Sequence, residues 1–532
     1  MKRSRSGLVR AATSISLATG LSRILGLVRD QVQSYVFGAG MVTDAYVAAF
    51  RIPNLLRDLF AEGALSAAFV PTFTAVRERE GDAAAFRLAD RILTVLSAVL
   101  AALSLAIFVA APWLLELYTP GFDETKLALA TTMTRILAPF LWFVALAALA
   151  MGMLNTHGRF FLPSLAPASF NIASILGVLA LAPLLASGGF EPGLSLAIGA
   201  IAGGFLQFAV QAPALRGIGW RFRPRFAPRD PGVRKVGKLM GPAVFGLAAT
   251  QVNILVDTSL ASRFDAAITW LALAFRLMQL PLGLFGVAIA TAHLARVSRS
   301  AAHRDLGGMR SQLASAIRMA AVLTIPATAG LIALRRPIVE LLFEHGRFTP
   351  EDTANTAAAA LCYGLGLFAY SVTKIQVPTF YALEQTRWPV ICSATAVILK
   401  IIASLTLLAW LPRWNVSPFL GLALSTSLAA WINFGMLAAG LRRSLGSIAG
   451  LGVARAIGLV SAISVAMGVG VYVLHDLLDR RISPQSVFGD AVLLCAVVGA
   501  GASVALAAAA AGGIPEARQL LDRLRRRDQT IG

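Results

Sequence analysis

The sequence predicts an all-α integral membrane protein with about 14 transmembrane helices. Of its 532 residues, 57% are hydrophobic and 14% are charged, and the mean hydropathy is +0.72. A soluble domain carries about 25% charged residues, so the composition is typical of a membrane protein. The apolar runs are long and rich in Ala and Leu, without the alternation that marks an outer-membrane barrel. We therefore expect helices to cross the membrane.

Each span requires about 20 mainly apolar residues. The candidate spans centre near residues 20, 58, 104, 140, 173, 204, 249, 282, 324, 367, 400, 430, 462 and 500.

The distribution of Lys and Arg predicts the orientation of these spans. With the N-terminus inside, the cytoplasmic segments hold 29 of the 47 basic residues and the opposite side holds 8. This is a positive-inside pattern, so both termini are expected in the cytoplasm. The net charge of +20 is then explained by topology and attraction to anionic lipid, rather than by nucleic-acid binding. Because Arg23 interrupts the first apolar run, we predict an uncleaved first helix there.

An internal repeat divides the chain at an offset near 225 residues. Ala49-Phe50-Arg51 matches Ala274-Phe275-Arg276, and spans three to six fall on spans nine to twelve. We predict an N-lobe of helices 1–6 with a basic linker (1–230), a C-lobe of helices 7–12 (231–445), two extra helices, 13 and 14 (446–513), and a basic cytoplasmic tail (514–532). Transporters built from repeats place their substrate between the halves, near the midplane.

Charged side chains interrupt the apolar spans, and each costs roughly 2.5–3.5 kcal/mol at the bilayer centre. They are Arg23, Arg29 and Asp30 in span one; Asp44, Arg51, Arg57, Asp58 and Glu62 in span two; and Arg276 in span eight. Cations outnumber acids in the core of the spans, which predicts a wet, positively charged cavity. Such a cavity suits an anionic substrate, since Arg binds phosphate oxygens through two parallel hydrogen bonds.

Other charges have simpler interpretations. For Arg135, Arg318 and Lys400, placement at a helix end or in an inter-helix salt bridge is favoured. Asp44, Asp58 and Glu62 have three open roles: holding the arginines, forming gating pairs, or accepting a coupling proton.

Signatures of soluble enzymes are absent from the sequence. It has no HExxH motif, no Walker loop and no Rossmann loop, and its five His and three Cys residues are scattered. We expect no enzymatic activity, no cofactor and no metal. The energy for transport would come from an ion, the membrane potential or the substrate gradient.

Several stretches carry a family resemblance. They include SRILGLVRD (22–30), FGAGMVTDAYVAAFRIPNLLRDLFAEGALSAAFVPTF (37–73), GMLNTHGRFFLPSLAPASFN (152–171) and FRLMQLPLGLFGVAIAT (275–291). From about residue 8 to residue 440 the chain resembles the MurJ (MviN) family of lipid II flippases, in the MOP superfamily that also holds the MATE exporters.

The resemblance implies a fold of two six-helix lobes in a V around a central cationic cavity. That cavity would take a diphosphate-sugar-peptide headgroup, and the two extra helices would line a groove for the polyprenyl tail. The positions matching the family's cavity arginines are Arg23, Arg29, Arg57 and Arg276. Asp30, Asp44, Arg51 and Glu62 are assigned to gating or ion coupling. Phe275 departs from the pattern, since some members carry an acid there.

The function so predicted is the flipping of lipid II across the bacterial cytoplasmic membrane by alternating access, for peptidoglycan synthesis. The expected partners are lipid II, membrane lipids and cell-wall synthesis proteins. One alternative is a flippase for another undecaprenyl-diphosphate-linked saccharide. A MATE-like multidrug exporter would need a cavity of the opposite charge, and a non-transporting scaffold would tolerate charge reversal there.

Overall fold

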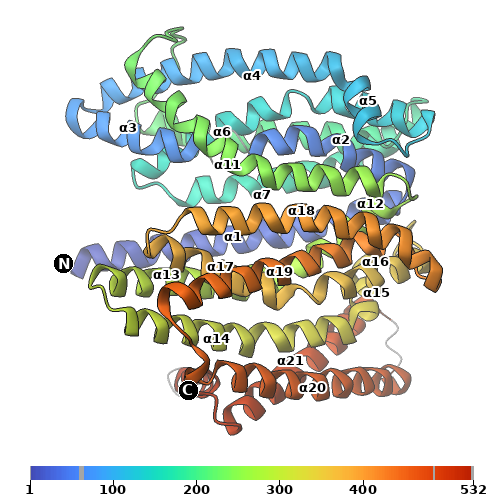
Figure 1. Ribbon diagram of the computed structural model, residues 1–532. Coiled ribbons are helices and arrows are strands. Elements are labelled where there is room, and N and C mark those ends of the chain that lie inside the picture. Colours follow the sequence, from blue (N-terminus) through green and yellow to red (C-terminus); the bar gives the residue numbers. More distant parts are fainter. Residues whose placement is uncertain (1, 59–64, 483–485, 529–532) are drawn as a thin grey trace. The chain divides into compact units, whose positions relative to one another are not determined.

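The computed structural model describes residues 2–58, 65–482 and 486–528, and within them every regular element is a helix (Figure 1). The all-α prediction is confirmed. The chain forms two compact units: Met1–Thr269 with Gly346–Phe348, and Trp270–His345 with Thr349–Gly532.

The first unit holds the helices of the N-terminal half. They are α1 (Lys2–Phe37), α2 (Met41–Arg57), α3 (Ser66–Glu80), α4 (Asp82–Tyr118), α5 (Glu124–Leu137), α6 (Phe140–Thr156), α7 (Phe161–Leu176), a π-helical turn (Gly177–Leu181), α8 (Ala182–Ser187), α9 (Leu194–Ala209), α10 (Ala212–Gly217) and α11 (Pro231–Ala261).

Helix α12 (Ala267–Pro281) begins in the first unit and continues into the second. The second unit then comprises a π-helical turn (Leu282–Gly286), α13 (Val287–Ala302), α14 (Leu306–Ala333), α15 (Arg335–Phe343), α16 (Pro350–Gly364), α17 (Leu367–Ala382), α18 (Arg387–Trp410), α19 (Leu420–Leu445), α20 (Val453–Ile482), α21 (Val487–Ala511) and α22 (Pro515–Asp528).

Ten helical segments among the described residues are long and apolar enough to cross a membrane, or 11 if the bent pair α16–α17 is one span. The three other expected spans, near residues 20, 58 and 249, coincide with α1, with α2 and α3, and with α11. These are helical but are not among the segments that meet that criterion. The predicted number of 14 is therefore not confirmed. In α1 and α2 the charges themselves lower the hydropathy.

Helices recur along the chain at the offset of the sequence repeat. The paired starts are Glu124 and Pro350 for α5 and α16, Phe161 and Arg387 for α7 and α18, and Leu194 and Leu420 for α9 and α19. The predicted domain boundary after residue 230 coincides with the start of α11, where Asp230 accepts hydrogen bonds from the Gly232 and Val233 amides. However, α11 packs against α3 and α4 in the first unit, and the two units divide after Thr269. The predicted lobes and tail stay predictions.

The first unit is built around aromatic side chains. Phe50 of α2 packs against Phe140 of α6, with ring centroids 5.0 Å apart, and against Phe170 of α7. Phe69 and Phe73 of α3 are fully buried in the neighbouring cluster with α4 and α6. These contacts hold α2, which carries several of the predicted site residues, against α6 and α7.

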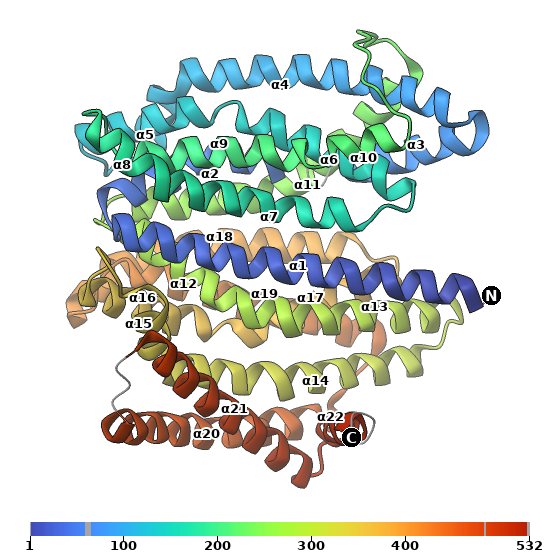
Figure 2. The same ribbon diagram turned by 180° about the vertical axis from the view of Figure 1, so that it is seen from behind.

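In the second unit, α13, α14, α17 and α19 share one apolar core, and α20 and α21 pack against α14 (Figures 1 and 2). The outer faces of α20 and α21 expose large apolar side chains such as Val465 and Phe488. In a membrane protein such faces contact lipid tails, since water would disfavour them.

The C-terminal helix α22 is held by a buried ion pair. Arg318 of α14 donates from Nε and Nη2 to the two carboxylate oxygens of Glu516, at 2.9 and 2.6 Å. Ser315 donates to the same carboxylate at 2.8 Å, and Ala517 beside it is fully buried. The start of the segment predicted as a basic tail is thus a helix docked on the second unit.

We expect Glu516→Gln to loosen α22 from α14. Burial raises the pKa of Glu516, but the hydrogen bonds from Arg318 and Ser315 outweigh it, so the pKa lies below its ordinary value of 4.5. A lowered pKa means that docking is fully stabilised above pH 4.5 and is lost as the pH falls through the lowered pKa. The fluorescence anisotropy of a probe on Asp522→Cys, in a Cys495→Ala background, measures the docking. In the parent protein the anisotropy should fall as the pH is lowered through the pKa of Glu516. In Glu516→Gln the anisotropy should already be low at pH 7.

Asp476→Asn, at a half-buried carboxylate elsewhere in the second unit, serves as the control and should leave the anisotropy unchanged. Equal anisotropy in the parent and in Glu516→Gln at neutral pH would contradict this account of the docking.

Candidate functional site

Arg29 and Asp30 form a buried pair on α1. Arg29 donates to Asp30 Oδ1 from Nη2 at 2.8 Å and from Nε at 3.2 Å, and only 13% and 7% of the two side chains are exposed. Arg29 Nη1 also donates to Asn171 of α7 at 3.2 Å, and the guanidinium lies over the Phe170 ring. Asn171 in turn donates to the Ser22 carbonyl at 2.9 Å. The predicted cavity arginine is therefore oriented by α7 and partly neutralised by its neighbour.

A second pair of the same form ends α2. Arg57 donates to Asp58 Oδ1 from Nη2 at 2.9 Å and from Nε at 3.2 Å. The other carboxylate oxygen of Asp58 accepts from Gln251 of α11 at 3.2 Å. About a quarter of the Arg57 side chain is exposed, so its guanidinium is more accessible than that of Arg29.

Asp44 is fully buried and forms the most enclosed charge cluster in the first unit. Its Oδ2 accepts from Lys126 Nζ of α5 at 2.9 Å, and its Oδ1 accepts from the Thr269 amide at 2.9 Å and from the Thr269 hydroxyl at 2.6 Å. Lys126 also lies over the Phe122 ring and 3.6 Å from Asp265. Because Thr269 is in the first turn of α12, the carboxylate satisfies an amide that has no partner within that helix.

The remaining predicted residues are separate from these clusters. Arg23 of α1 is exposed, and Arg51 of α2 lies beside Tyr118. Neither forms an ion pair with any residue that the structure describes. Arg276 is exposed on α12 in the second unit, next to Phe275, whose ring packs edge-on against Tyr363. Glu62 lies outside the described residues.

Four partners were not predicted: Lys126, Asn171, Gln251 and Thr269. Asn171 ends one of the stretches that carry the family resemblance, so its position was marked, although its contact with Arg29 was not. Lys126 lies 82 residues from Asp44, and no local pattern joins the two.

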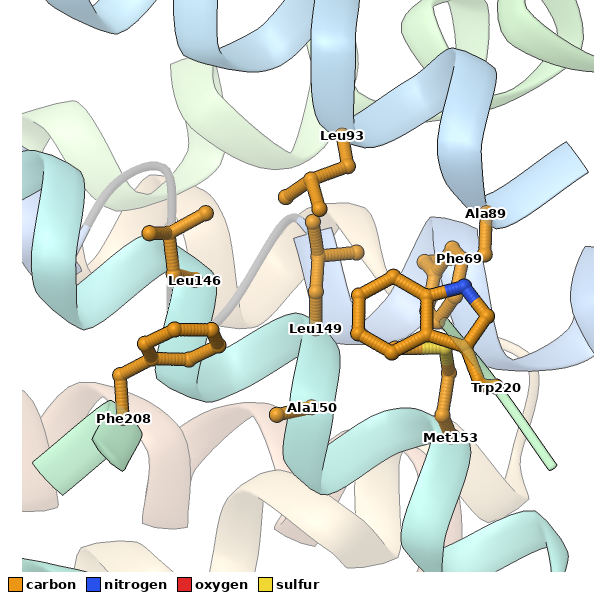
Figure 3. Close-up of a pocket in the computed structure, with 9 residues that line it drawn as sticks. All are labelled: Phe69, Ala89, Leu93, Leu146, Leu149, Ala150, Met153, Phe208 and Trp220. Atoms are coloured by element: carbon orange, nitrogen blue, oxygen red, sulfur yellow. The ribbon is translucent and has the colours of Figure 1, made fainter. Parts of the chain in front are cut away.

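The first unit also contains a small apolar void, shown in Figure 3. The labelled side chains, among them Phe69, Leu149 and Trp220, point toward one another around about 10 Å³ of space. A cavity must offer about 10–15 Å³ and several polar partners to hold one water molecule. This void is therefore a packing gap and not a ligand site.

The fold is that of a known class of transporters. A solved multidrug resistance MATE family transporter of the MOP superfamily, in an inward-facing conformation, aligns with a TM-score of 0.63 over 81% of this chain and 96% of its own. At 15% identity this likeness shows the fold alone. The shared fold and the apolar helices of this chain define it as a multi-pass helical membrane protein with a transporter fold.

Sequence comparisons place the chain within that class. A family model described as lipid II flippase MurJ matches residues 33–490. The chain is 36% identical to a probable lipid II flippase MurJ of Vibrio cholerae, over 82% of this chain and 83% of that one. It is also 36% identical to a lipid II flippase MurJ of Burkholderia cenocepacia, over 82% and 84% of the two chains. The chain belongs to the MurJ family.

A solved structure agrees with this assignment. A lipid II flippase MurJ in an inward closed conformation aligns with a TM-score of 0.73 and 26% identity, over 92% of this chain and 98% of its own. The resemblance stated from the sequence is thereby confirmed.

Proposed function

We propose that this protein flips lipid II from the inner to the outer leaflet of the bacterial cytoplasmic membrane, for peptidoglycan synthesis. Membership of the MurJ family carries this proposal. The arginines in otherwise apolar helices support it chemically, because a lipid-linked diphosphate is an anion that guanidinium groups bind well.

Arg23, Arg29, Arg57 and Arg276 are the residues that we propose contact the headgroup. Arg23 and Arg276 are exposed, so a phosphate can reach them without a helix first separating from its neighbours. Arg29 and Arg57 already bind an adjacent Asp, and that carboxylate occupies the position that a phosphate oxygen would take. Substrate would then replace Asp30 or Asp58 as the anionic partner.

Asp44, Arg51 and Glu62 take gating or coupling roles in this proposal. The Asp44–Lys126 pair joins α2 to α5, and Thr269 adds the start of α12. A buried three-way connection of this kind is a two-state element: it is either formed or broken. Alternating access requires such elements, and both chain termini would lie in the cytoplasm.

The polyprenyl tail would remain in the bilayer against α20 and α21. These helices expose apolar faces and pack on α14 within the second unit. Cell-wall synthesis proteins are the expected neighbours in the membrane.

Replacing either exposed arginine tests the proposed function. We expect Arg23→Ala and Arg276→Ala, at normal protein levels, to slow lipid II flipping in proteoliposomes by at least about tenfold, because each removes a charge-assisted hydrogen bond worth roughly 1.5–3 kcal/mol. In cells the precursor should accumulate on the cytoplasmic face.

Arg135→Gln is the matched control, since Arg135 contacts only the Phe108 carbonyl and ring among the described residues. Unchanged flipping in both alanine variants would overturn the arginine assignment. Equal transport of another undecaprenyl-diphosphate-linked saccharide would overturn the choice of substrate.

A further inference from the structure

We propose that a groove on the first unit binds a resident anionic phospholipid of the inner leaflet, distinct from the transported lipid. The groove encloses about 750 Å³ between α4, α6, the α9–α10 pair and the loop that follows α10. Its apolar wall includes Leu93, Trp142 and Leu146, and Arg216 and Arg221 lie at its basic end. The inference relies on the proposed orientation, which puts that end at the cytoplasmic face.

The loop that forms one side of the groove is fixed in place. Trp220 is buried and donates from Nε1 to Asp90 of α4 at 3.0 Å. The Arg223 amide donates to the same carboxylate at 3.3 Å, and the Arg225 amide donates to the Thr94 hydroxyl at 2.9 Å. The basic linker predicted from the sequence is therefore docked along α4. A docked loop presents its side chains in a defined geometry, which a specific site requires.

Two cations at this end have no counter-ion among the described residues. Arg216 and Arg221 are exposed, and neither makes an ion pair or a side-chain hydrogen bond with a residue that the structure describes. Two nearby cations, by contrast, are engaged: Arg91 pairs with Asp230, and Arg159 donates to the Gly217 carbonyl at 3.1 Å. The groove therefore offers free guanidinium groups of the kind that bind phosphate most strongly.

The apolar wall of the groove is long enough for an acyl chain. Leu146 and Trp142 lie about 15 Å and about 21 Å along α6 from its end at Thr156. The wall therefore extends at least as far as half the thickness of a hydrocarbon core of about 30 Å. Leu93 and Leu146, together with Phe208 and Trp220, also border the small void of Figure 3, so the groove reaches the packed core of the unit. A phosphate at the arginines thus places its acyl chain along the apolar wall.

The test counts phospholipids that stay bound to the intact protein. The full chain is extracted from vesicles of equal phosphatidylglycerol and phosphatidylcholine, and native mass spectrometry measures the retained lipid. We expect preferential retention of phosphatidylglycerol, reduced roughly tenfold for each arginine removed in Arg216→Gln and Arg221→Gln. Ser97→Phe fills the apolar part without changing charge and should also reduce retention. Arg229→Gln, an exposed change in the same loop but outside the groove, should have no effect.

Several results would overturn the proposal: equal retention of phosphatidylcholine, undiminished retention in the Arg216→Gln/Arg221→Gln double variant, or displacement by free glycerol phosphate alone. Displacement by an undecaprenyl phosphate would reassign the groove to the transported lipid. Because the readout is bound phospholipid, Arg23→Ala should leave it unchanged even where that variant abolishes flipping. Failure of the lipid site and failure of the proposed function are thus separable.

Discussion

Lys126→Met is expected to lower the stability of the protein by about 3–5 kcal/mol, the usual cost of leaving one member of a buried ion pair alone. Asp44 would keep the hydrogen bonds from Thr269, but its second oxygen would lose its only cation within 3 Å among the described residues. The temperature of half-unfolding of the purified protein, followed by intrinsic fluorescence, measures the effect.

The double variant Lys126→Met/Asp44→Asn distinguishes a charge effect from a packing effect. Because no unpaired charge then remains, we expect it to recover a large part of the lost stability. Lys235→Met, an exposed lysine of α11, is the control and should change little. A double variant no more stable than Lys126→Met would show that the pair is not held by its charge.

Gly346→Ala is expected to displace the segment Gly346–Phe348 from the end of α1. Gly346 has a φ of +65°, and a Cβ there would lie 2.2 Å from the Tyr35 carbonyl oxygen. The contact is reciprocal, because a Cβ on Gly38 would lie 2.5 Å from the Arg347 carbonyl oxygen. Both opposing atoms belong to the backbone, so a side-chain rotation cannot relieve the clash. The hydrogen bond from the Arg347 amide to the Tyr35 carbonyl, 3.0 Å long, should be lost.

Hydrogen exchange at the Arg347 amide is the direct measurement, and it should become fast in Gly346→Ala. Gly158→Ala is the matched control: Gly158 has a φ of +73° but no atom within 4 Å of its Cβ position. It therefore isolates the backbone strain, about 1–2 kcal/mol, from the steric clash. If the two variants lose equal stability and the Arg347 amide stays protected, the clash is not the cause.

The fold was largely predictable because lipid imposes a simple rule on sequence. The apolar runs of α4 and α21 are long enough to predict membrane spans directly, since a span requires about 20 apolar residues. The Asp230-Pro231 pair is also a helix-start signal, and α11 begins there. The number of spans was not predictable in the same way, because α1 and α2 carry charges that composition alone cannot place in lipid or in water.

The residues of the predicted site stay predictions, and their pairings differ in how far the sequence could give them. Asp30 follows Arg29 directly, so chain connectivity alone keeps them close. Asp44 and Lys126 meet only because α2 packs on α5, and that packing depends on many apolar contacts around Tyr46 and Met133. The sequence expectation of excess cations overlooked Lys126. It left open whether Asp58 holds an arginine, and it did not pair Arg29 with Asp30.

That adjacency has an electrical consequence. An elementary charge that moves across the membrane gains or loses roughly 2.3 kcal/mol per 100 mV. Each of these two pairs moves as a neutral dipole when its helix moves, because the acid is the next residue in the chain after the arginine. The pairs are Arg29 with Asp30 and Arg57 with Asp58. They contribute almost no gating charge. Any voltage sensitivity arising from these two helices must then come from their other charged residues, among them Arg23, Arg51 and Asp44, none of which is paired with an adjacent residue.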